Sequence, residues 1–403
     1  MRRNDTGLSL QRVPMRPDPA LTADEARHTQ RVSEYLAAEI ARAGGWIDFE
    51  RYMDIALYAP GLGYYSAGAR KLGRGGDFTT APEISGLFGA CIAQQCADVL
   101  KQMAQGSILE IGAGSGRLAV DVLSRLDALG ALPERYRILE ISADLRDRQH
   151  SAIAAAIPHL LERVEWIEAP PETQFDGVIL ANEVLDALPV VRFRWHPTYC
   201  EELGAATERG RLVWSPRPAS ATTSAVCDAL EAAGGGWEDG YESEYCPRLE
   251  TWTREVTRAL RTGLVLWVDY GLPRAQYYFP ERRDGTLLCH FRQRPFDDPF
   301  LYPGLQDITA WVDFTWLAES CAAAACALAG FTTQAYFLAG LGIDGEMRSL
   351  AGGDEHRHAR LANEARQLML PGEMGERFKA MAWVRGTDAP LRGFGLKDLR
   401  HTL

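Results

Sequence analysis

The chain has 403 residues, of which 46% are hydrophobic and 24% charged, a balance typical of a globular protein with a large core. The net charge of −11 argues against broad nucleic-acid binding, which needs a basic surface, and no apolar run reaches the roughly 20 residues needed to cross a bilayer. We therefore expect a cytoplasmic protein whose partners include neither nucleic acid nor membrane.

Eight cysteines stand singly in apolar or alanine-rich runs. No two of them form a C-x-x-C pair, and none has a histidine nearby at the spacing of a metal site. We expect buried, reduced thiols, with no structural metal and no disulfide framework.

The N-terminal part divides into two regions. Residues 1–24 combine four arginines with three prolines, and because proline interrupts regular helices we expect a flexible arm. Residues 25–90 are expected to form a helical region. Apolar positions on one face predict a helix over 24–43, ended by Gly44 and Gly45, and a second helix over 49–57. The loop that follows is rich in glycine, aromatic and basic residues, and we expect helix again over 84–100.

The stretch SILEIGAGSGRLAVDVL, residues 107–123, predicts a buried strand, a glycine turn and the start of a helix. Gly112, Gly114 and Gly116 take every second position, which lets the backbone turn sharply and leaves no β-carbon between the main chain and a ligand. Arg117 stands where a dinucleotide fingerprint has its third glycine, and the Gly-Lys-Ser/Thr ending of a P-loop is missing. A glycine turn without a ligand is the alternative. With Glu110 in front, the E-x-G-x-G-x-G pattern resembles motif I of class I S-adenosyl-L-methionine methyltransferases.

The runs after this turn predict a doubly wound parallel sheet. Strands are expected over 136–141, 164–167, 178–180 and 264–269, alternating with helical segments. In such a sheet the ligand lies beyond the carboxyl ends of the strands. Glu140, at the end of one strand, is therefore a candidate to accept hydrogen bonds from two ribose hydroxyls. The alternative is that Glu140 is an ordinary acidic residue at the surface. Asn182 and Glu183 are the polar residues at the carboxyl end of the strand expected over 178–180.

We divide the α/β chain accordingly. The core is expected in residues 91–196, 263–272 and 316–388, interrupted by an insertion at 197–262 and by a lid or substrate-side insertion at 273–315, with a tail at 389–403. In the last part of the core we predict a helix over 316–328 and strands over 331–337 and 378–384.

Several separate strings resemble the MidA family: GDFTTAPEISGLFG at 76–89, LEIGAGSGRL at 109–118, ILEIS at 138–142, ANEVLDALPV at 181–190, VDYG at 268–271 and QDITAWVDFT at 306–315. The members of this family are S-adenosyl-L-methionine-dependent methyltransferases related to a mitochondrial complex I assembly factor. The resemblance implies a Rossmann-like class I methyltransferase sheet with an N-terminal helical region and substrate-side insertions. It also implies S-adenosyl-L-methionine as cofactor and a protein substrate, with arginine as acceptor in the mitochondrial relatives. A homodimer is compatible with the sequence.

The resemblance also implies site residues, position by position. The cofactor site would contain Glu110, Gly112, Ala113, Gly114, Gly116, Glu140, Asn182 and Glu183, with Asp77, Thr79, Thr80 and Glu83 placed over the cofactor.

Methyl transfer to an arginine side chain requires acidic residues in the site. The guanidinium is a cation at neutral pH, so carboxylates must orient it and help to take its proton. We choose Glu183 and Asp186 for this role, although an acid at a helix start is explained equally well by the helix dipole. Asp307 and Asp313 are further candidates to face a substrate, against the plainer explanation of solvated surface positions.

Two other functions stay open on the same residues. One is a small-molecule methyltransferase, and the other is a scaffold or assembly factor that binds the cofactor while its catalysis is vestigial. A nicotinamide-dependent oxidoreductase is disfavoured by Arg117.

Overall fold

The computed structural model describes residues 19–66 and 80–403, so most of the arm predicted for residues 1–24 lies outside it. No helix in the described ranges is long and apolar enough to cross a membrane. The α-helices are α1 (Ala23–Arg42), α2 (Phe49–Tyr58), α3 (Ala81–Ile84), α4 (Gly86–Leu100), α5 (Arg117–Ala128), α6 (Ala143–Ala156), α7 (Ala221–Gly234), α8 (Leu249–Thr257), α9 (Arg274–Tyr277), α10 (Phe314–Ala323), α11 (Gln334–Gly340), α12 (Ile343–Ala351) and α13 (Glu355–Met369). Short 3-10 turns lie at Pro158–Arg163, Arg392–Phe394 and Arg400–Thr402.

The main sheet has eight strands among the described residues. Its order is β15 (Ala327–Thr333), β16 (Phe378–Arg385), β10 (Leu260–Leu272), β5 (Phe175–Asn182), β2 (Ser107–Ile111), β3 (Tyr136–Leu139) and β4 (Val164–Ile167), with β14 (Val312–Asp313) paired to the end of β10. The strands from β10 to β4 are parallel, whereas β16 is antiparallel to both of its neighbours. The predicted doubly wound α/β sheet is confirmed, and the strand order reverses direction between β2 and β5.

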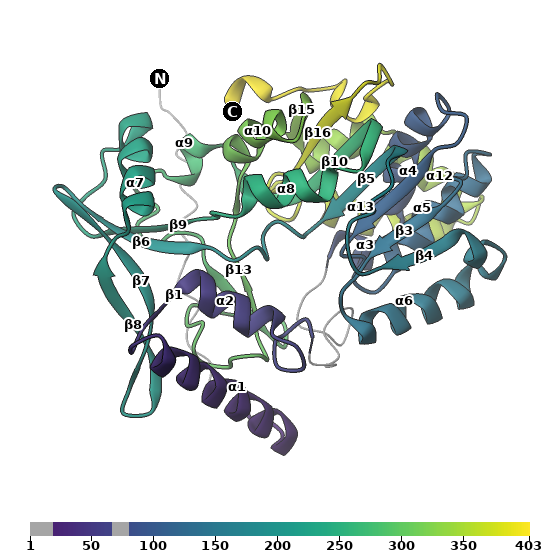
Figure 1. The fold of residues 1–403 in the computed structure, drawn as a ribbon. Coiled ribbons are helices and arrows are strands. Elements are labelled where there is room, and N and C mark those ends of the chain that lie inside the picture. Colours follow the sequence, from purple (N-terminus) through teal and green to yellow (C-terminus); the bar gives the residue numbers. More distant parts are fainter. Residues whose placement is uncertain (1–18, 67–79) are drawn as a thin grey trace.

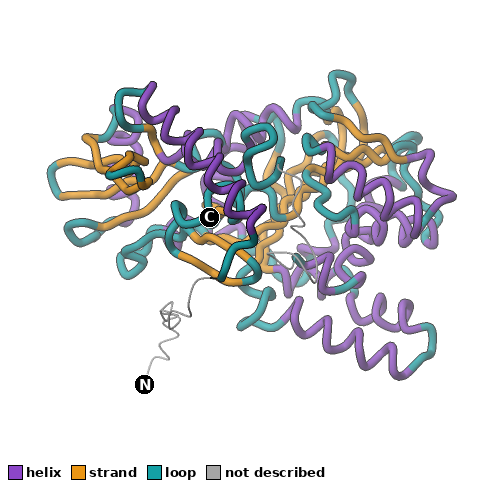
Figure 2. Tube along the Cα trace, turned by 90° about the horizontal axis from the view of Figure 1, so that it is seen from below, coloured by secondary structure: helices purple, strands orange, loops and turns teal. Residues whose placement is uncertain are grey.

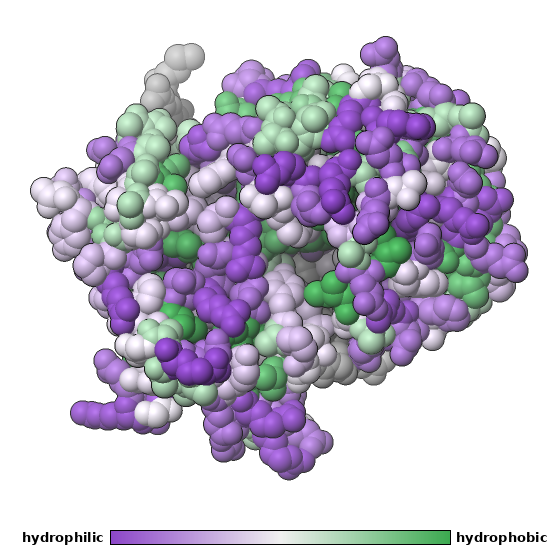
Figure 3. Space-filling model, in the orientation of Figure 1, coloured by the Kyte–Doolittle hydropathy of each residue, from purple (hydrophilic) through white to green (hydrophobic). Residues whose placement is uncertain are grey.

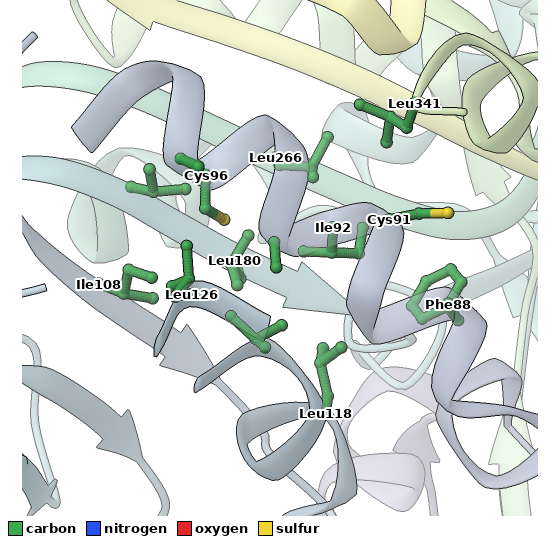
Figure 4. Packing of buried hydrophobic residues seen from close by; sticks show 14 of the residues in the cluster. Phe88, Cys91, Ile92, Cys96, Ile108, Leu118, Leu126, Leu180, Leu266 and Leu341 are labelled. Carbon is green, nitrogen blue, oxygen red and sulfur yellow. The ribbon is translucent and has the colours of Figure 1, made fainter. Parts of the chain in front are cut away.

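Helices cover both faces of this sheet (Figure 1). Because successive side chains of a strand point to opposite faces, Ile108 of β2 packs with α4 and α5, while Leu109 packs with α8 and α10. Figure 4 shows α4 lying on the first face, with Ile92 and Cys96 close to Leu180 of β5. The central parallel strands β2, β5 and β10 are thus buried on both sides, which explains why they read as continuous apolar runs, whereas β4 at the edge is partly exposed.

Two smaller sheets lie beside the main one (Figures 1 and 2). The first contains β1 (Ile47–Asp48), β7 (Tyr199–Glu208), β6 (Val191–His196) and β9 (Tyr241–Tyr245), with β8 (Arg211–Pro218) paired to β7; the second contains β12 (Arg294–Phe296), β11 (Leu288–Phe291) and β13 (Asp307–Thr309). Strand β6, which the predicted boundaries place in the core, therefore belongs to a smaller sheet. In Figure 3 the surface is hollowed between the half with the main sheet and the half with the smaller ones.

The prediction for the C-terminal part was wrong in two elements. Helix α10 ends at Ala323 and not at 328, and the strand occupies Ala327–Thr333 and not 331–337. The alanine run favours helix, but Ala325 takes a left-handed φ of +52° that ends it. Thr333 then starts helix α11, because its side chain accepts a hydrogen bond from the amide of Tyr336 (3.4 Å). Helices α12 and α13 occupy a stretch for which the sequence had predicted no element.

Candidate active site

The glycine turn after β2 has the backbone shape that its residues favour. Gly112, Gly114 and Gly116 have φ values of +66°, +56° and +83°, which side chains rarely adopt. A β-carbon on Gly112 would lie 3.2 Å from Val184 Cγ2, and one on Gly116 would lie 3.1 Å from the Cα of Gln149. The turn is therefore packed between the segment after β5 and helix α6, and Ala113 sits within it, accepting the Gly116 amide (2.8 Å).

Gln149 of α6 ties Glu140 to this turn. Its Nε2 donates to the carbonyl of Gly114 (3.0 Å) and to Oε2 of Glu140 (3.1 Å), and its Oε1 accepts from the indole of Trp166 (3.0 Å). The other carboxylate oxygen of Glu140 accepts from the amide of Ser142 (2.9 Å). The network holds the acid at the carboxyl end of β3, beside the glycine turn. Its role as a ribose ligand stays a prediction.

The environment of Glu140 suits a nucleoside. Burial raises the pKa of its carboxyl, while the hydrogen bonds from Ser142 and Gln149 lower it. Each carboxylate oxygen has two acceptor positions, so one position on each oxygen remains for a hydroxyl. Ile141, the next residue, is 60% exposed and presents an apolar surface beside the acid.

Asp269 fixes the turn that follows β5. Glu183 has a left-handed φ of +53°, and its amide donates to the carbonyl of Val268 on β10 (2.9 Å). Oδ2 of Asp269 accepts hydrogen bonds from the next three amides, those of Val184 (3.1 Å), Leu185 (2.9 Å) and Asp186 (3.4 Å). The acid at the end of β10 thereby sets the direction in which Glu183 leaves the sheet.

The side chain of Glu183 is largely enclosed. Its Oε1 accepts from Asn182 Nδ2 (3.2 Å) and from the amide of Ala81 (3.3 Å), while Oε2 and the Oδ1 of Asn182 have no partner among the described residues. Burial, followed by repulsion from Asp186, raises the pKa of Glu183 to about 8. The group is thus poised near neutral pH, where a carboxyl can take up or release a proton.

Asp186 lies behind Glu183 and is only 5% exposed. Burial, followed by the charges of Asp269 and Asp307, raises its pKa well above the ordinary value, while hydrogen bonds from the hydroxyl of Tyr270 and the amide of Ala187 lower it. Its Oδ1 has no partner among the described residues. Neither Glu183 nor Asp186 forms an ion pair within residues 19–66 and 80–403. Because buried acids without a counter-charge destabilise one another, a cation bound between them would be stabilised.

The segment around helix α3 contacts both the glycine turn after β2 and the turn after β5. The hydroxyl of Ser115 in the glycine turn donates to the carboxylate of Glu83, and the amide of Ala81 donates to Glu183. Helix α3 therefore bridges the turn after β2 and the turn after β5. Thr80 stands at its N-cap position without a capping hydrogen bond, and the predicted Asp77 and Thr79 lie outside the described residues.

Glu110 is bonded inside the protein. Its Oε2 accepts from the hydroxyl of Tyr136 (2.7 Å), and burial raises its pKa to about 7. Its contact with a cofactor stays a prediction.

The two further candidates are buried and do not occupy the solvated surface that was the plainer expectation. Asp313 caps helix α10 through the amides of Thr315 and Trp316 (both 3.0 Å) and pairs with Arg274 (3.3 Å), so its role is structural. Asp307 is 7% exposed, accepts from the hydroxyl of Tyr65 (2.9 Å) and acts electrostatically on Glu183 and Asp186.

Three residues of the site were not predicted: Gln149, Asp269 and Tyr65. For Asp269 there was a signal, because it is an acid that closes an apolar strand. Gln149 is one polar residue on a helix and Tyr65 one aromatic in a loop, and neither has a local pattern that marks it.

S-adenosyl-L-methionine, the cofactor that the resemblance implies, fits these residues. The turn at 112–116 has no side chain larger than the methyl group of Ala113 and the hydroxymethyl group of Ser115, Glu140 offers acceptors for ribose hydroxyls, and Asn182 Oδ1 is a buried acceptor without a described partner. These groups lie on both sides of the point between β2 and β5 where the strand order reverses, the position at which open α/β sheets bind ligands.

Comparison with known proteins points to the same chemistry. Residues 91–332 match the family described as "Putative S-adenosyl-L-methionine-dependent methyltransferase". A crystal structure from Burkholderia thailandensis, bound to S-adenosyl-homocysteine, is 40% identical with a TM-score of 0.91, and a native structure from the same organism is 39% identical with a TM-score of 0.88. Each similarity covers 96% of this chain and 100% of the other.

Curated relatives are more distant. "Protein arginine methyltransferase NDUFAF7, mitochondrial" of Danio rerio is 29% identical over 384 residues, which cover 86% of this chain and 85% of the relative. The protein of the same description from Homo sapiens is 27% identical, covering 85% of this chain and 80% of the relative.

Proposed function

Since the chain belongs to this family of S-adenosyl-L-methionine-dependent methyltransferases, we propose that it methylates arginine side chains of a protein substrate. The Rossmann-like methyltransferase fold and the cofactor predicted from the sequence are both confirmed by that membership. The arginine acceptor is supported by the descriptions of the curated relatives and by the acids of the site.

One observation carries the proposal. Glu183 and Asp186 are held together after β5 with oxygens that have no partner among the described residues, and burial raises the pKa of both. Two such carboxyls favour a cationic ligand over a neutral one, because a cation would relieve their mutual repulsion. A guanidinium, with five N–H donors in a planar fork, matches two carboxylates better than other cationic side chains do.

The bound cofactor supplies a methyl group on a sulfonium, which leaves by direct displacement. The chain's contribution on this side is to bind and orient. Gly112, Gly114 and Gly116 would let the main chain approach the cofactor, and Glu140, held by Gln149, would bind the ribose hydroxyls. Alignment of the reacting groups by such binding lowers the barrier by several kcal/mol (about 7 or more in well-oriented systems).

On the acceptor side the chain must orient a guanidinium nitrogen and take its proton. Glu183 is suited to both tasks, because its carboxylate is fixed by Asn182 and by the amide of Ala81, and its pKa of about 8 lies near neutral pH. Asp186 would hold a second edge of the guanidinium. Asp269 acts as a positioning residue, since it binds the backbone and not the substrate.

Tritium transfer tests the proposal. The full chain is incubated with methyl-tritiated S-adenosyl-L-methionine and with protein extracted from a source-cell strain that lacks the gene, and labelled protein is then hydrolysed to amino acids. We expect the label in methylated arginine.

The other two functions predict different products. Label in small molecules alone would identify a small-molecule methyltransferase. Binding of the cofactor with no labelled product from any fraction would identify a scaffold with vestigial catalysis.

A further inference from the structure

We propose that Asp307, held by Tyr65, is the third carboxylate of the acceptor site and makes it selective for a guanidinium over an ammonium group. This inference rests on the proposed function and extends the site beyond the residues after β5, to a strand of a different sheet.

Hydrogen bonds bring three remote segments together here. The amide of Ala310, just after β13, donates to the carbonyl of Asp186 (2.9 Å). The hydroxyl of Tyr58 donates to the carbonyl of Ala187 (2.8 Å), and the hydroxyl of Tyr65 donates to Oδ1 of Asp307 (2.9 Å). The end of α2, the turn after β5 and strand β13 therefore meet around the same acids.

The charges within this cluster act on one another. Burial and then the charge of Asp186 raise the pKa of Glu183, to which Asp307 adds a smaller effect. Burial and then the charges of Asp269 and Asp307 raise the pKa of Asp186. Asp307 also raises the pKa of the Tyr65 hydroxyl, again after burial. The three carboxyls therefore lie within electrostatic reach of one another in a part of the protein from which water is largely excluded.

The unpartnered oxygen of Asp186, which also supports the proposed function, indicates that the cluster can hold a ligand. Asp186 is nineteen-twentieths buried, and its Oδ1 has no partner among the described residues. A buried polar atom of this kind carries a free-energy cost unless something binds it. A group with several donors would satisfy it while contacting Glu183 and Asp307.

The aromatic residues at the site favour a planar cation. The rings of Tyr58 and Tyr65 are stacked, with centroids 5.5 Å apart and planes 20° apart, and the hydroxyl of Tyr65 is bonded to Asp307. A guanidinium stacks on aromatic rings and donates in its own plane, so it can meet carboxylates on several edges at once. An ammonium is a compact charge with three donors and cannot use that arrangement as fully.

Binding of two matched cations tests the inference without requiring the natural substrate. Butylguanidinium and butylammonium are titrated into the full chain loaded with S-adenosyl-homocysteine, and affinities are measured by ligand-observed NMR. Asp307→Asn is compared with Asp297→Asn, which changes an exposed aspartate nearby in the chain.

We expect wild type and Asp297→Asn to bind butylguanidinium more tightly than butylammonium. Asp307→Asn should bind butylguanidinium about tenfold more weakly and lose most of the preference, since hydrogen bonds to charged groups are among the stronger ones. Tyr65→Phe, which keeps the ring and removes only the hydroxyl, should weaken binding less. If Asp307→Asn does not fold, Tyr65→Phe decides the outcome: weaker binding of butylguanidinium supports the inference, and wild-type affinity overturns it.

Unchanged affinity in Asp307→Asn, or equal binding of the two cations by wild type, overturns the inference. Absence of saturable binding of butylguanidinium to wild type overturns it as well. The tritium experiment keeps the two proposals apart. If wild type labels no arginine, the proposed function fails; if it labels arginine and Asp307→Asn has an unchanged KM for the acceptor protein, only the role of Asp307 fails.

Discussion

The carboxylate of Asp269 holds the main chain that leaves Glu183. Its Oδ2 accepts hydrogen bonds from the three amides after Glu183, and Glu183 itself has a φ of +53°. A residue with a side chain pays about 1 kcal/mol or more for this conformation, so the turn depends on the bonds that fix it.

Asp269→Leu should therefore destabilise the protein and slow methyl transfer. Buried amides without an acceptor cost about 1–3 kcal/mol each, and the turn that carries Glu183 would lose its anchor. Asp269→Asn is the milder comparison, because its carbonyl oxygen can still accept from the three amides and only the hydrogen bond from the amide of Tyr270 to Oδ1 (2.9 Å) is lost. We expect Asn to keep most of the wild-type free energy of unfolding in urea and Leu to lose several kcal/mol; equal losses in the two variants would contradict this role.

Glu183→Gln should lower turnover by about 100-fold or more while leaving cofactor affinity unchanged, because an amide can contact the acceptor but cannot take its proton. Calorimetry with S-adenosyl-homocysteine and single-turnover transfer measure the two effects separately. In the wild type, kcat/KM should rise with pH up to about 8, where the carboxyl of the free enzyme loses its proton. Full activity in the variant would remove Glu183 from the mechanism.

Glu183→Gln should also change how stability depends on pH. In the folded protein the carboxyl keeps its proton up to about pH 8, whereas its ordinary pKa of 4.5 applies after unfolding. Unfolding thus releases a proton between these values, and the free energy of unfolding falls as pH rises from 4.5 to 8. Glutamine has no such proton, so the variant should gain at most about 5 kcal/mol over wild type at pH 8 and almost nothing at pH 4.5. Urea unfolding at both pH values measures the difference in the free energy of unfolding between the variant and the wild type. The same difference at both pH values would refute the raised pKa of Glu183.

Gly114→Val should abolish cofactor binding in a protein that still folds. A valine at φ +56° is strained, and on the proposed cofactor placement its side chain would enter the space of the cofactor. Gly130→Val introduces the same residue at φ +61° in an open turn with nothing within 4 Å of the added β-carbon. Both variants should lose a similar stability, about 1–2 kcal/mol or more, while only Gly114→Val loses binding of S-adenosyl-homocysteine by calorimetry.

Gln149→Leu should weaken cofactor binding about tenfold, because it removes the donor that joins Glu140 to the glycine turn and leaves both acceptors buried. Trp166→Phe removes only the donor to Gln149 and should have a smaller effect. A Gln149 variant with wild-type affinity and lower stability would show that the bridge serves the fold alone.

Patterns that are local in the sequence were the ones that could be predicted. The spacing of Gly112, Gly114 and Gly116 predicts a sharp turn, and all three glycines have the positive φ that such a turn uses. The acid after an apolar strand placed Glu140 correctly beside that turn. Both features follow from a few consecutive residues and from the geometry of parallel sheets.

Features that depend on remote contacts could not be predicted. Asp307 and Tyr65 are 242 positions apart, and nothing in either neighbourhood indicates that they meet. The wrong boundaries predicted for α10 and β15 have a different cause. The alanines at 322–325 favour helix, whereas the chain turns at Ala325. In that case tertiary structure overrode local preference.

The three-stranded sheet that carries Asp307 lies outside the main sheet and shares no strand with it. Half of the residues assigned to the cofactor come from β2 to α6, and the others come from the segment around α3 and from the turn after β5. Those assigned to the acceptor come from the turn after β5, from β13 and from the loop after α2. On the proposed role of Asp307, changes in β13 should therefore alter acceptor binding and leave cofactor binding unchanged. Relatives that differ mainly in this short strand are the natural place to look for altered acceptors.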